Sequence, residues 1–174
     1  MLKNAVFNND RTHRYTLARI WNSEVSLILF IGLNPSTADE LRDDNTVTRL
    51  TTFAQNWGYG GFYLVNCYPW IETDSDDLDA RLMEESDKIL NKAKTENKKH
   101  IIRVWNFCHT PVFMWGAHEV DPGMVNWLKN RFRGAKCFGH TKDGHPKHPL
   151  YLPNETNLVD FIPKIRKWII SLKK

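Results

Sequence analysis

The chain has 174 residues, of which 41% are hydrophobic and 12% aromatic, with a net charge of +4 and a pI of about 9.0. This composition excludes a disordered chain and supplies a substantial core, so we expect a single domain over residues 1–174. The excess positive charge mildly favours a polyanionic partner.

The cysteines and the lengths of the apolar runs indicate the cellular compartment in which the protein is expected. Three cysteines are present, without Cys-x-x-Cys spacing: Cys67, Cys108 and Cys137. An odd number of this kind indicates buried thiols in a reducing compartment. No signal peptide is visible, and no apolar run approaches the ~18 residues of a membrane-spanning helix. We therefore expect a cytoplasmic monomer with no membrane contact.

The amino-terminal third predicts an edge hairpin. Residues 1–13 are polar, and we expect an irregular arm there. Residues 15–21 alternate like a half-exposed strand, and the turn at residues 22–24 leads into an apolar strand at 26–33. We expect these two strands to pair at the edge of the sheet.

The remainder alternates helices with short apolar strands. We expect strands at 62–66, 112–116 and 135–139, and helices at 45–57, 84–106, 122–132 and 158–172. Such alternation predicts a three-layer α/β/α fold. Its centre would be a mainly parallel four-stranded sheet, with the amino-terminal strand added at one edge.

The first core strand ends abruptly at Gly32-Leu33-Asn34-Pro35-Ser36. Ligands of open α/β sheets bind where such strands end. Gly32 frees the backbone and Pro35 fixes it, so Asn34 is held on a stiff turn. Its amide can orient a water molecule or a polar ligand, and the alternative is a turn that only closes the strand.

The second core strand also ends in asparagine, at Asn66, with Tyr68 and Pro69 close behind. An asparagine amide both donates and accepts, which suits the edge of a nucleobase. Neighbouring parallel strands would bring Asn34 and Asn66 to one rim. A buried asparagine that caps the strand end is the alternative.

A loop rich in histidine and proline follows the last strand, and it contains His140, His145 and His148. Proline follows the last two, so their imidazoles stand on a stiffened loop and can stabilise a developing carbonyl anion. The spacing offers no cysteine or clear carboxylate partner, so we expect no metal site.

The run Asp43-Asp44-Asn45-Thr46, followed by Arg49, has two interpretations. Asp44 can cap the helix that begins there. Alternatively, Asp43 or Asp44 adds a carboxylate above the site, as a general base for water or a partner of a ribose hydroxyl.

These motifs occur in the order found in the uracil-DNA glycosylase superfamily, and Gly32-Leu33-Asn34-Pro35 resembles the first motif of its mismatch-specific branch. The resemblance implies that Asn34 positions the hydrolytic water and Asn66 reads the pyrimidine. It also implies that a loop histidine, His145 by order or His148 beside it, stabilises the departing base. Ser36 stands where uracil-specific enzymes carry tyrosine, which implies a roomier pocket.

Residues 15–153 as a whole resemble a family of unknown function, DUF1643, whose pattern has Asn-Pro-Ser-Thr-Ala-Asp near the start and Asp-Gly-His-Pro-x-His-Pro-Leu-Tyr near the end. The candidate catalytic residues are Asn34, one or the other of His145 and His148, and Asp44 if it contributes a carboxylate to the site. The expected substrate-binding residues are Gly32, Leu33, Pro35, Ser36, Arg49, Asn66, Tyr68 and Lys147.

The expected function is hydrolysis of the N-glycosidic bond of a pyrimidine or modified base in DNA, either single-stranded or flipped from a duplex. This chemistry requires neither a metal nor an organic cofactor. Three alternatives remain open: an enzyme acting on free nucleotides or nucleosides, a non-catalytic module that binds a nucleotide or modified base, and a structural or protein-interaction domain.

Overall fold

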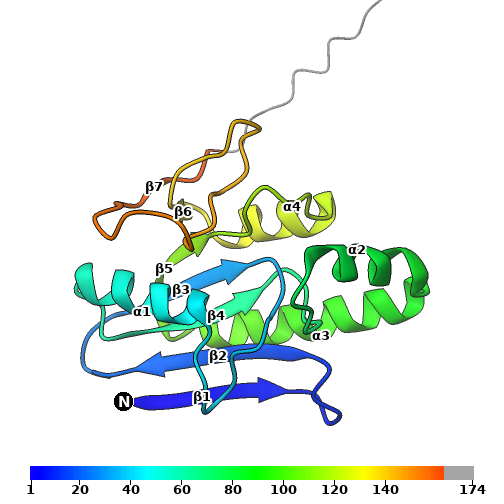
Figure 1. The fold of residues 1–174 in the computed structure, drawn as a ribbon, viewed down its shortest axis with the longest axis horizontal. Coiled ribbons are helices and arrows are strands. Elements are labelled where there is room, and N and C mark those ends of the chain that lie inside the picture. Colours follow the sequence, from blue (N-terminus) through cyan, green and yellow to red (C-terminus); the bar gives the residue numbers. More distant parts are fainter. Residues whose placement is uncertain (163–174) are drawn as a thin grey trace, which may run out of the picture.

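The computed structural model describes residues 1–162 and has a seven-stranded sheet at its centre (Figure 1). The strands lie in the order β1-β2-β4-β3-β5-β6-β7. Their bounds are β1 Leu2–Phe7, β2 Arg14–Ile20, β3 Leu27–Gly32, β4 Gly61–Asn66, β5 Cys108–Phe113, β6 Lys136–Cys137 and β7 Val159–Asp160. Four helices accompany them: α1 Asn45–Asn56, α2 Ser75–Glu84, α3 Asp87–Trp105 and α4 Pro122–Arg131.

The sheet is mixed, which confirms the α/β class. Strands β4, β3, β5 and β6 pair in parallel, whereas β1 with β2, β2 with β4, and β6 with β7 pair antiparallel. We expected a mainly parallel four-stranded sheet with one added strand. The sheet instead has seven strands, and three of its six strand pairs are antiparallel. Residues 1–13 contain β1, so the expected irregular arm was also wrong.

The expected hairpin between residues 15–21 and 26–33 does not form. Strand β2 pairs with β1 and β4 instead of β3. The physical reason lies in β3, which is buried from Ile28 to Gly32 and has parallel partners on both edges. A strand that is apolar on both faces belongs in the middle of a sheet, so no edge is left for β2.

The helices depart from expectation mainly at their ends. The acidic segment 72–87 contains α2. Glu85 and Ser86 are not helical and separate α2 from α3. Residues 158–162 contain the short strand β7 in place of the start of a helix. The rest of the expected helix at 158–172 lies outside the described residues.

Two apolar clusters cover the two faces of the sheet, because alternate residues of a strand point to opposite faces. Leu29, Ile31 and Val65 pack with residues of α2, α3 and α4, namely Leu78, Leu90, Ile101, Val104, Met124 and Leu128. Ile28, Phe30 and Phe62 pack with the α1 residues Val47, Leu50, Phe53 and Ala54. Helices therefore lie on both sides of the sheet.

Two buried arginines of β2 hold the loop between β3 and α1. Arg14 Nη1 donates to the carbonyl of Ala38 at 2.6 Å, and Arg19 Nε donates to Asp43 Oδ1 at 2.7 Å. The loop is thereby tied to the sheet just before α1 begins. These bonds fix the position of the segment that follows Asn34.

Candidate functional site

A cavity of about 380 Å³ opens at the carboxyl ends of β3 and β4. We call it the strand-end cavity. The register pairs Gly32 with Asn66, so these two strands end at the same level. The walls are formed by Arg14, Gly32, Leu33, Asn34, Ser36, Asp44, Thr46, Leu64, Asn66, Glu72, Thr73, Met114, Trp115, His148 and Leu150. Strands, loops and a helix start from seven segments of the chain thus contribute to one polar pocket.

Asn34 lies on the turn after β3, with its amide orientation fixed. Its Nδ2 donates to the carbonyls of Pro35, at 3.0 Å, and Glu72, at 2.7 Å. These bonds clasp the turn to the segment before α2. Because both carbonyls take N–H groups, the acceptor oxygen of the amide is the end that can hold a water molecule.

Asn66 is the last residue of β4 and is only 3% exposed. Its Nδ2 has no hydrogen-bond partner among residues 1–162. Buried amide donors are nearly always paired, since an unpaired one costs about 1–3 kcal/mol. An unpartnered donor in the wall of a cavity therefore indicates a ligand that brings an acceptor.

Gly32 makes room for that amide. A Cβ at position 32 would lie 2.7 Å from Asn66 Oδ1, which is closer than real Cβ contacts. The glycine thus permits the close approach of the Asn66 side chain to the backbone of β3. Strand pairing and side-chain placement are coupled at this point.

The structure separates the two loop histidines. His148 lines the strand-end cavity, whereas His145 is not among the lining residues, and its Nε2 lies 3.8 Å from Glu119 Oε1. Residues 140–146 close into a tight hairpin, in which the Thr141 amide donates to the carbonyl of His145 at 2.8 Å. The hairpin turns His145 away and carries His148 to the cavity.

Gly116 allows this hairpin to dock. Its amide donates to the carbonyl of Pro146 at 2.9 Å, and its φ of 80° is a conformation that favours glycine. A Cβ there would meet the Cβ of His148 at 3.5 Å. The glycine therefore holds the histidine loop against the end of β5.

The imidazole of His148 is tuned by its surroundings. Part of the residue faces solvent, but the walls of the cavity desolvate the ring and lower its pKa below 6.5, while Asp44 opposes that shift. The Leu150 amide donates to His148 Nδ1 at 3.4 Å. The neutral ring then carries its proton on Nε2, where it can donate to a ligand.

Asp44 is the N-cap of α1, and its Oδ1 accepts from the Val47 amide at 2.8 Å. The capping interpretation is therefore confirmed. The same residue lines the strand-end cavity, so capping does not remove its carboxylate from the site. Asp43, the other acid considered, instead pairs with Lys3 and Arg19.

Several expected binding residues lie elsewhere. Pro35, Arg49, Tyr68 and Lys147 are not among the residues that line the cavity. Tyr68 is 2% exposed; its hydroxyl accepts from the Asp121 amide at 2.9 Å, and burial raises its pKa to about 12. Arg49 donates to Asn154 and to the Leu152 carbonyl. The structure gives both residues structural contacts.

Sequence reasoning missed other residues of the wall. Met114 and Trp115 follow β5 and are buried at its carboxyl end. Glu72 and Thr73 precede α2, and Arg14 begins β2. The expected strand at 112–116 was the signal for the first two, because ligands bind at the ends of such strands. No pattern indicated Arg14, because an arginine at the start of a strand is usually solvated.

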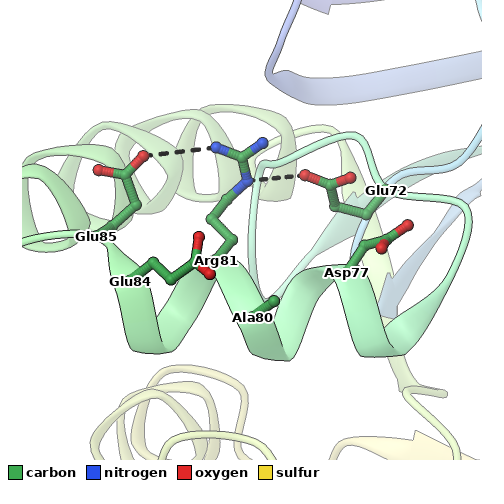
Figure 2. Close-up of a pocket in the computed structure, with 6 residues that line it drawn as sticks. All are labelled: Glu72, Asp77, Ala80, Arg81, Glu84 and Glu85. Atoms are coloured by element: carbon green, nitrogen blue, oxygen red, sulfur yellow. Dashed lines mark hydrogen bonds and ion pairs between the residues drawn. The ribbon is translucent and has the colours of Figure 1, made fainter.

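A second hollow of about 520 Å³ lies over α2, and we call it the α2 hollow. It is lined by Glu72, Asp77, Ala80, Arg81, Glu84 and Glu85. Figure 2 shows Arg81 reaching Glu72 on one side and Glu85 on the other, at 2.7 Å and 3.6 Å. Glu72 borders both hollows, and its carboxylate is held by Arg81.

Residues 1–162 form neither a cluster of metal ligands nor a membrane-spanning helix. No group of three or more histidine, cysteine, aspartate or glutamate residues in this part of the chain is arranged to hold a metal ion. None of the helices found there combines the length and apolar character needed to cross a bilayer.

The fold and the site define a mixed α/β protein with a polar cavity at the ends of its parallel strands, the usual position of a ligand in such sheets. The chain belongs to the family described as "Protein of unknown function (DUF1643)", whose family model matches residues 14–150. Both ends of the match, Arg14 and Leu150, line the strand-end cavity. No curated protein and no solved structure matches the chain.

Proposed function

We propose that the protein hydrolyses the N-glycosidic bond of a pyrimidine or modified base in DNA. The observation that carries this proposal is the unpartnered, buried Nδ2 of Asn66 in the wall of the strand-end cavity. A base carbonyl would supply the missing acceptor, and a flipped or single-stranded nucleotide can present one there.

The proposed roles follow from where each group lies. Asn66 contacts the edge of the base. Asn34 orients a water molecule that attacks the sugar carbon, and Asp44 accepts the proton that this water loses. The sugar gains a hydroxyl group, and the base leaves with the electrons of the broken bond. His148 donates from Nε2 to the anion that forms on the base. One oriented donor of this kind typically contributes about 3 kcal/mol to stabilising the transition state.

The choice between the two histidines rests on position. His148 lines the cavity and His145 does not, so we assign the family histidine to His148 in place of the order-based choice. We also propose that the fold is akin to the uracil-DNA glycosylases, on the strength of the motifs after the first, second and last core strands and the parallel strands β4, β3, β5 and β6.

A DNA substrate is supported by the residue that follows the cavity wall. Leu150 lines the cavity, and Tyr151, next in the chain, is 92% exposed. An exposed aromatic ring at such a place is suited to stacking on a base, worth about 1–3 kcal/mol per base. The positive net charge of the chain agrees with a polyanionic partner.

A second candidate is hydrolysis of free nucleotides or nucleosides. It is favoured by the acidic residues beside the cavity, because Glu72 borders it and α2 adds further carboxylates (Figure 2). Such a surface repels a DNA backbone but not a small substrate that enters the cavity whole.

The test is base release, followed by mass spectrometry, from DNA strands and free nucleotides that carry uracil, mismatched thymine or 5-modified pyrimidines. We expect release from DNA that is lost in Asn34→Ala and His148→Ala and retained in Asn22→Ala, a surface asparagine away from the cavity. Asn34→Asp also loses the donor to the Glu72 carbonyl but keeps an acceptor oxygen for water, so it separates the effect of the lost hydrogen bond from that of the lost acceptor. Full release by Asn34→Ala would overturn the mechanism, and release from free nucleotides alone would favour the second candidate.

A further inference from the structure

Arg14 is a buried cation whose donors are largely unused. The residue is 2% exposed and lines the strand-end cavity. Nη1 donates to the Ala38 carbonyl, but Nε has no partner among residues 1–162, and no carboxylate of this part of the chain lies within salt-bridge distance. Burial lowers the pKa to about 10, so the guanidinium remains charged at neutral pH.

Arg19, the other buried arginine of β2, has the partners that Arg14 lacks. The side chain of Arg19 has no exposed surface, and it pairs with Asp43 at 2.6 Å. It also donates to the carbonyls of Ala18 and Asp39. Because a buried charge is costly unless it is paired and hydrogen-bonded, the contrast indicates that the counter-charge of Arg14 arrives with a ligand.

Further donors face the same cavity from other elements. Asp44 and Thr46, at the start of α1, line it. The first intrahelical bond runs from the Thr48 amide to the Asp44 carbonyl, so the amides of Asn45 and Thr46 precede the helical ladder. The positive end of a helix favours an anion. Asn66 Nδ2 adds a side-chain donor from β4.

The charges that oppose an anion are few. The Asp44 carboxylate lines the cavity, and one of its oxygens is bonded to the Val47 amide. Glu72 also lines it, but its carboxylate accepts from Arg81 Nε at 2.7 Å. His148, with its lowered pKa, is neutral at pH 7. The Asp44 carboxylate therefore offsets part of the attraction of Arg14 for an anion, which favours a ligand with a single negative charge over one with two.

We infer that Arg14 binds a phosphate group of the nucleotide whose base contacts Asn66. This inference rests on the proposed function. Phosphate oxygens are strong acceptors for guanidinium and helix-terminal amide donors, and they would supply both the negative charge and the acceptors that Arg14 lacks. The phosphate belongs either to a free nucleotide or to a DNA backbone, and the singly charged diester of DNA suits the Asp44 carboxylate better.

The experiment compares calorimetric binding of deoxyuridine and thymidine with that of their 5′-monophosphates and of short strands that contain them. We expect wild-type protein to bind the phosphate-bearing probes at least tenfold more tightly than the nucleosides. Arg14→Gln should abolish that preference and leave nucleoside affinity within about twofold. Arg11→Gln, which removes an exposed arginine away from the cavity, should preserve it. Equal affinity for nucleosides and nucleotides in wild-type protein would overturn the inference.

A measurement without a variant guards against misfolding of Arg14→Gln. Inorganic phosphate should compete with the monophosphates for wild-type protein and should not compete with the nucleosides. Competition with neither would contradict the subsite. Tight binding of the strands relative to the monophosphates identifies a diester, and the reverse identifies a free nucleotide.

The two proposals fail in different ways. A phosphate preference that depends on Arg14, without base release from any substrate, would leave the subsite standing and remove the glycosylase activity. Base release that is equally fast from nucleosides and nucleotides, and unchanged in Arg14→Gln, would remove the subsite and leave the activity standing.

Discussion

The strand-end cavity and the α2 hollow share Glu72 but differ in how their arginines are satisfied. Arg81 in the larger hollow is 37% exposed and lies between two glutamates (Figure 2). Arg14 in the smaller cavity is 2% exposed and has no carboxylate partner among the described residues. The arginine of the larger space therefore has carboxylate partners, and the arginine of the smaller one, within residues 1–162, does not.

The difference shows that volume is a poor guide to a ligand site in this molecule. The α2 hollow has the greater volume, about 520 Å³ against 380 Å³, but its charges are exposed or paired with each other. The strand-end cavity carries two buried groups with unused donors, Arg14 and Asn66. Since such groups cost free energy in the empty protein, their presence is the stronger sign of a bound partner.

The largest expected effect comes from removing the unpartnered amide. Asn66→Leu keeps the branching and the number of heavy atoms of the side chain but has no donor, so base release should fall by at least about a hundredfold, as expected when a buried polar contact to a substrate is lost. The unfolding temperature should not fall, because the substitution also removes an unsatisfied buried donor. Single-turnover base release and thermal unfolding measure the two quantities.

Arg81→Ala is the matched variant in the α2 hollow and should release base at the wild-type rate. A loss of activity in Arg81→Ala with normal activity in Asn66→Leu would reverse the comparison between the two hollows.

Asp44 allows capping to be separated from chemistry. Asp44→Ala should lower the free energy of unfolding by about 1 kcal/mol, because the Val47 amide loses its cap. Asp44→Asn keeps a good cap and should remain within about 0.5 kcal/mol of wild type, yet lose base release roughly tenfold or more without the carboxylate. Urea unfolding and base release distinguish these outcomes.

If Asp44→Asn retained the full rate of base release, Asp44 would be a helix cap alone. The catalytic role would then rest on Asn34 and His148.

A smaller effect is expected in the titration of His148. Desolvation lowers its pKa below 6.5 and the Asp44 carboxylate raises it. Replacing Asp44 by asparagine removes the charge that stabilises the imidazolium, so the pKa should fall further. The ring is then neutral over a wider range, and any rate that needs neutral His148 should persist to lower pH. NMR titration of the histidine ring measures both values.

A His148 pKa at or above 6.5, or one unchanged in Asp44→Asn, would show that the ring does not sense the cavity.

Local sequence patterns were sufficient for part of this site. The apolar runs that precede Asn34 and Asn66 predicted that both residues follow or end a strand. Because the two strands are parallel neighbours, we expected both residues at one rim of the sheet, and the pairing of Gly32 with Asn66 accounts for this. The cap at Asp44 could also be read locally, from an aspartate just before an apolar helical spacing. These features depend on a few neighbouring residues, so the sequence carries them directly.

Other features depend on long-range pairing and were not predictable. The position of Arg14 in the cavity wall requires β2 to pair with β4, which no local pattern indicates. The choice between His145 and His148 depends on a hairpin that docks on Gly116, more than twenty residues away in the sequence. Strand β1 alternates between exposed and half-buried residues. Because residues 1–13 are polar, nothing in the sequence indicated a strand there.

The central claim is that the unused donor of Asn66 faces the substrate. Its most direct test is the side-chain amide resonance of Asn66 in ¹⁵N-labelled protein, assigned with Asn66→Leu, during titration with deoxyuridine 5′-monophosphate and thymidine 5′-monophosphate. We predict that this resonance shifts while the Arg81 Nε resonance in the α2 hollow stays in place. A shift at Arg81 with no change at Asn66 would contradict the account.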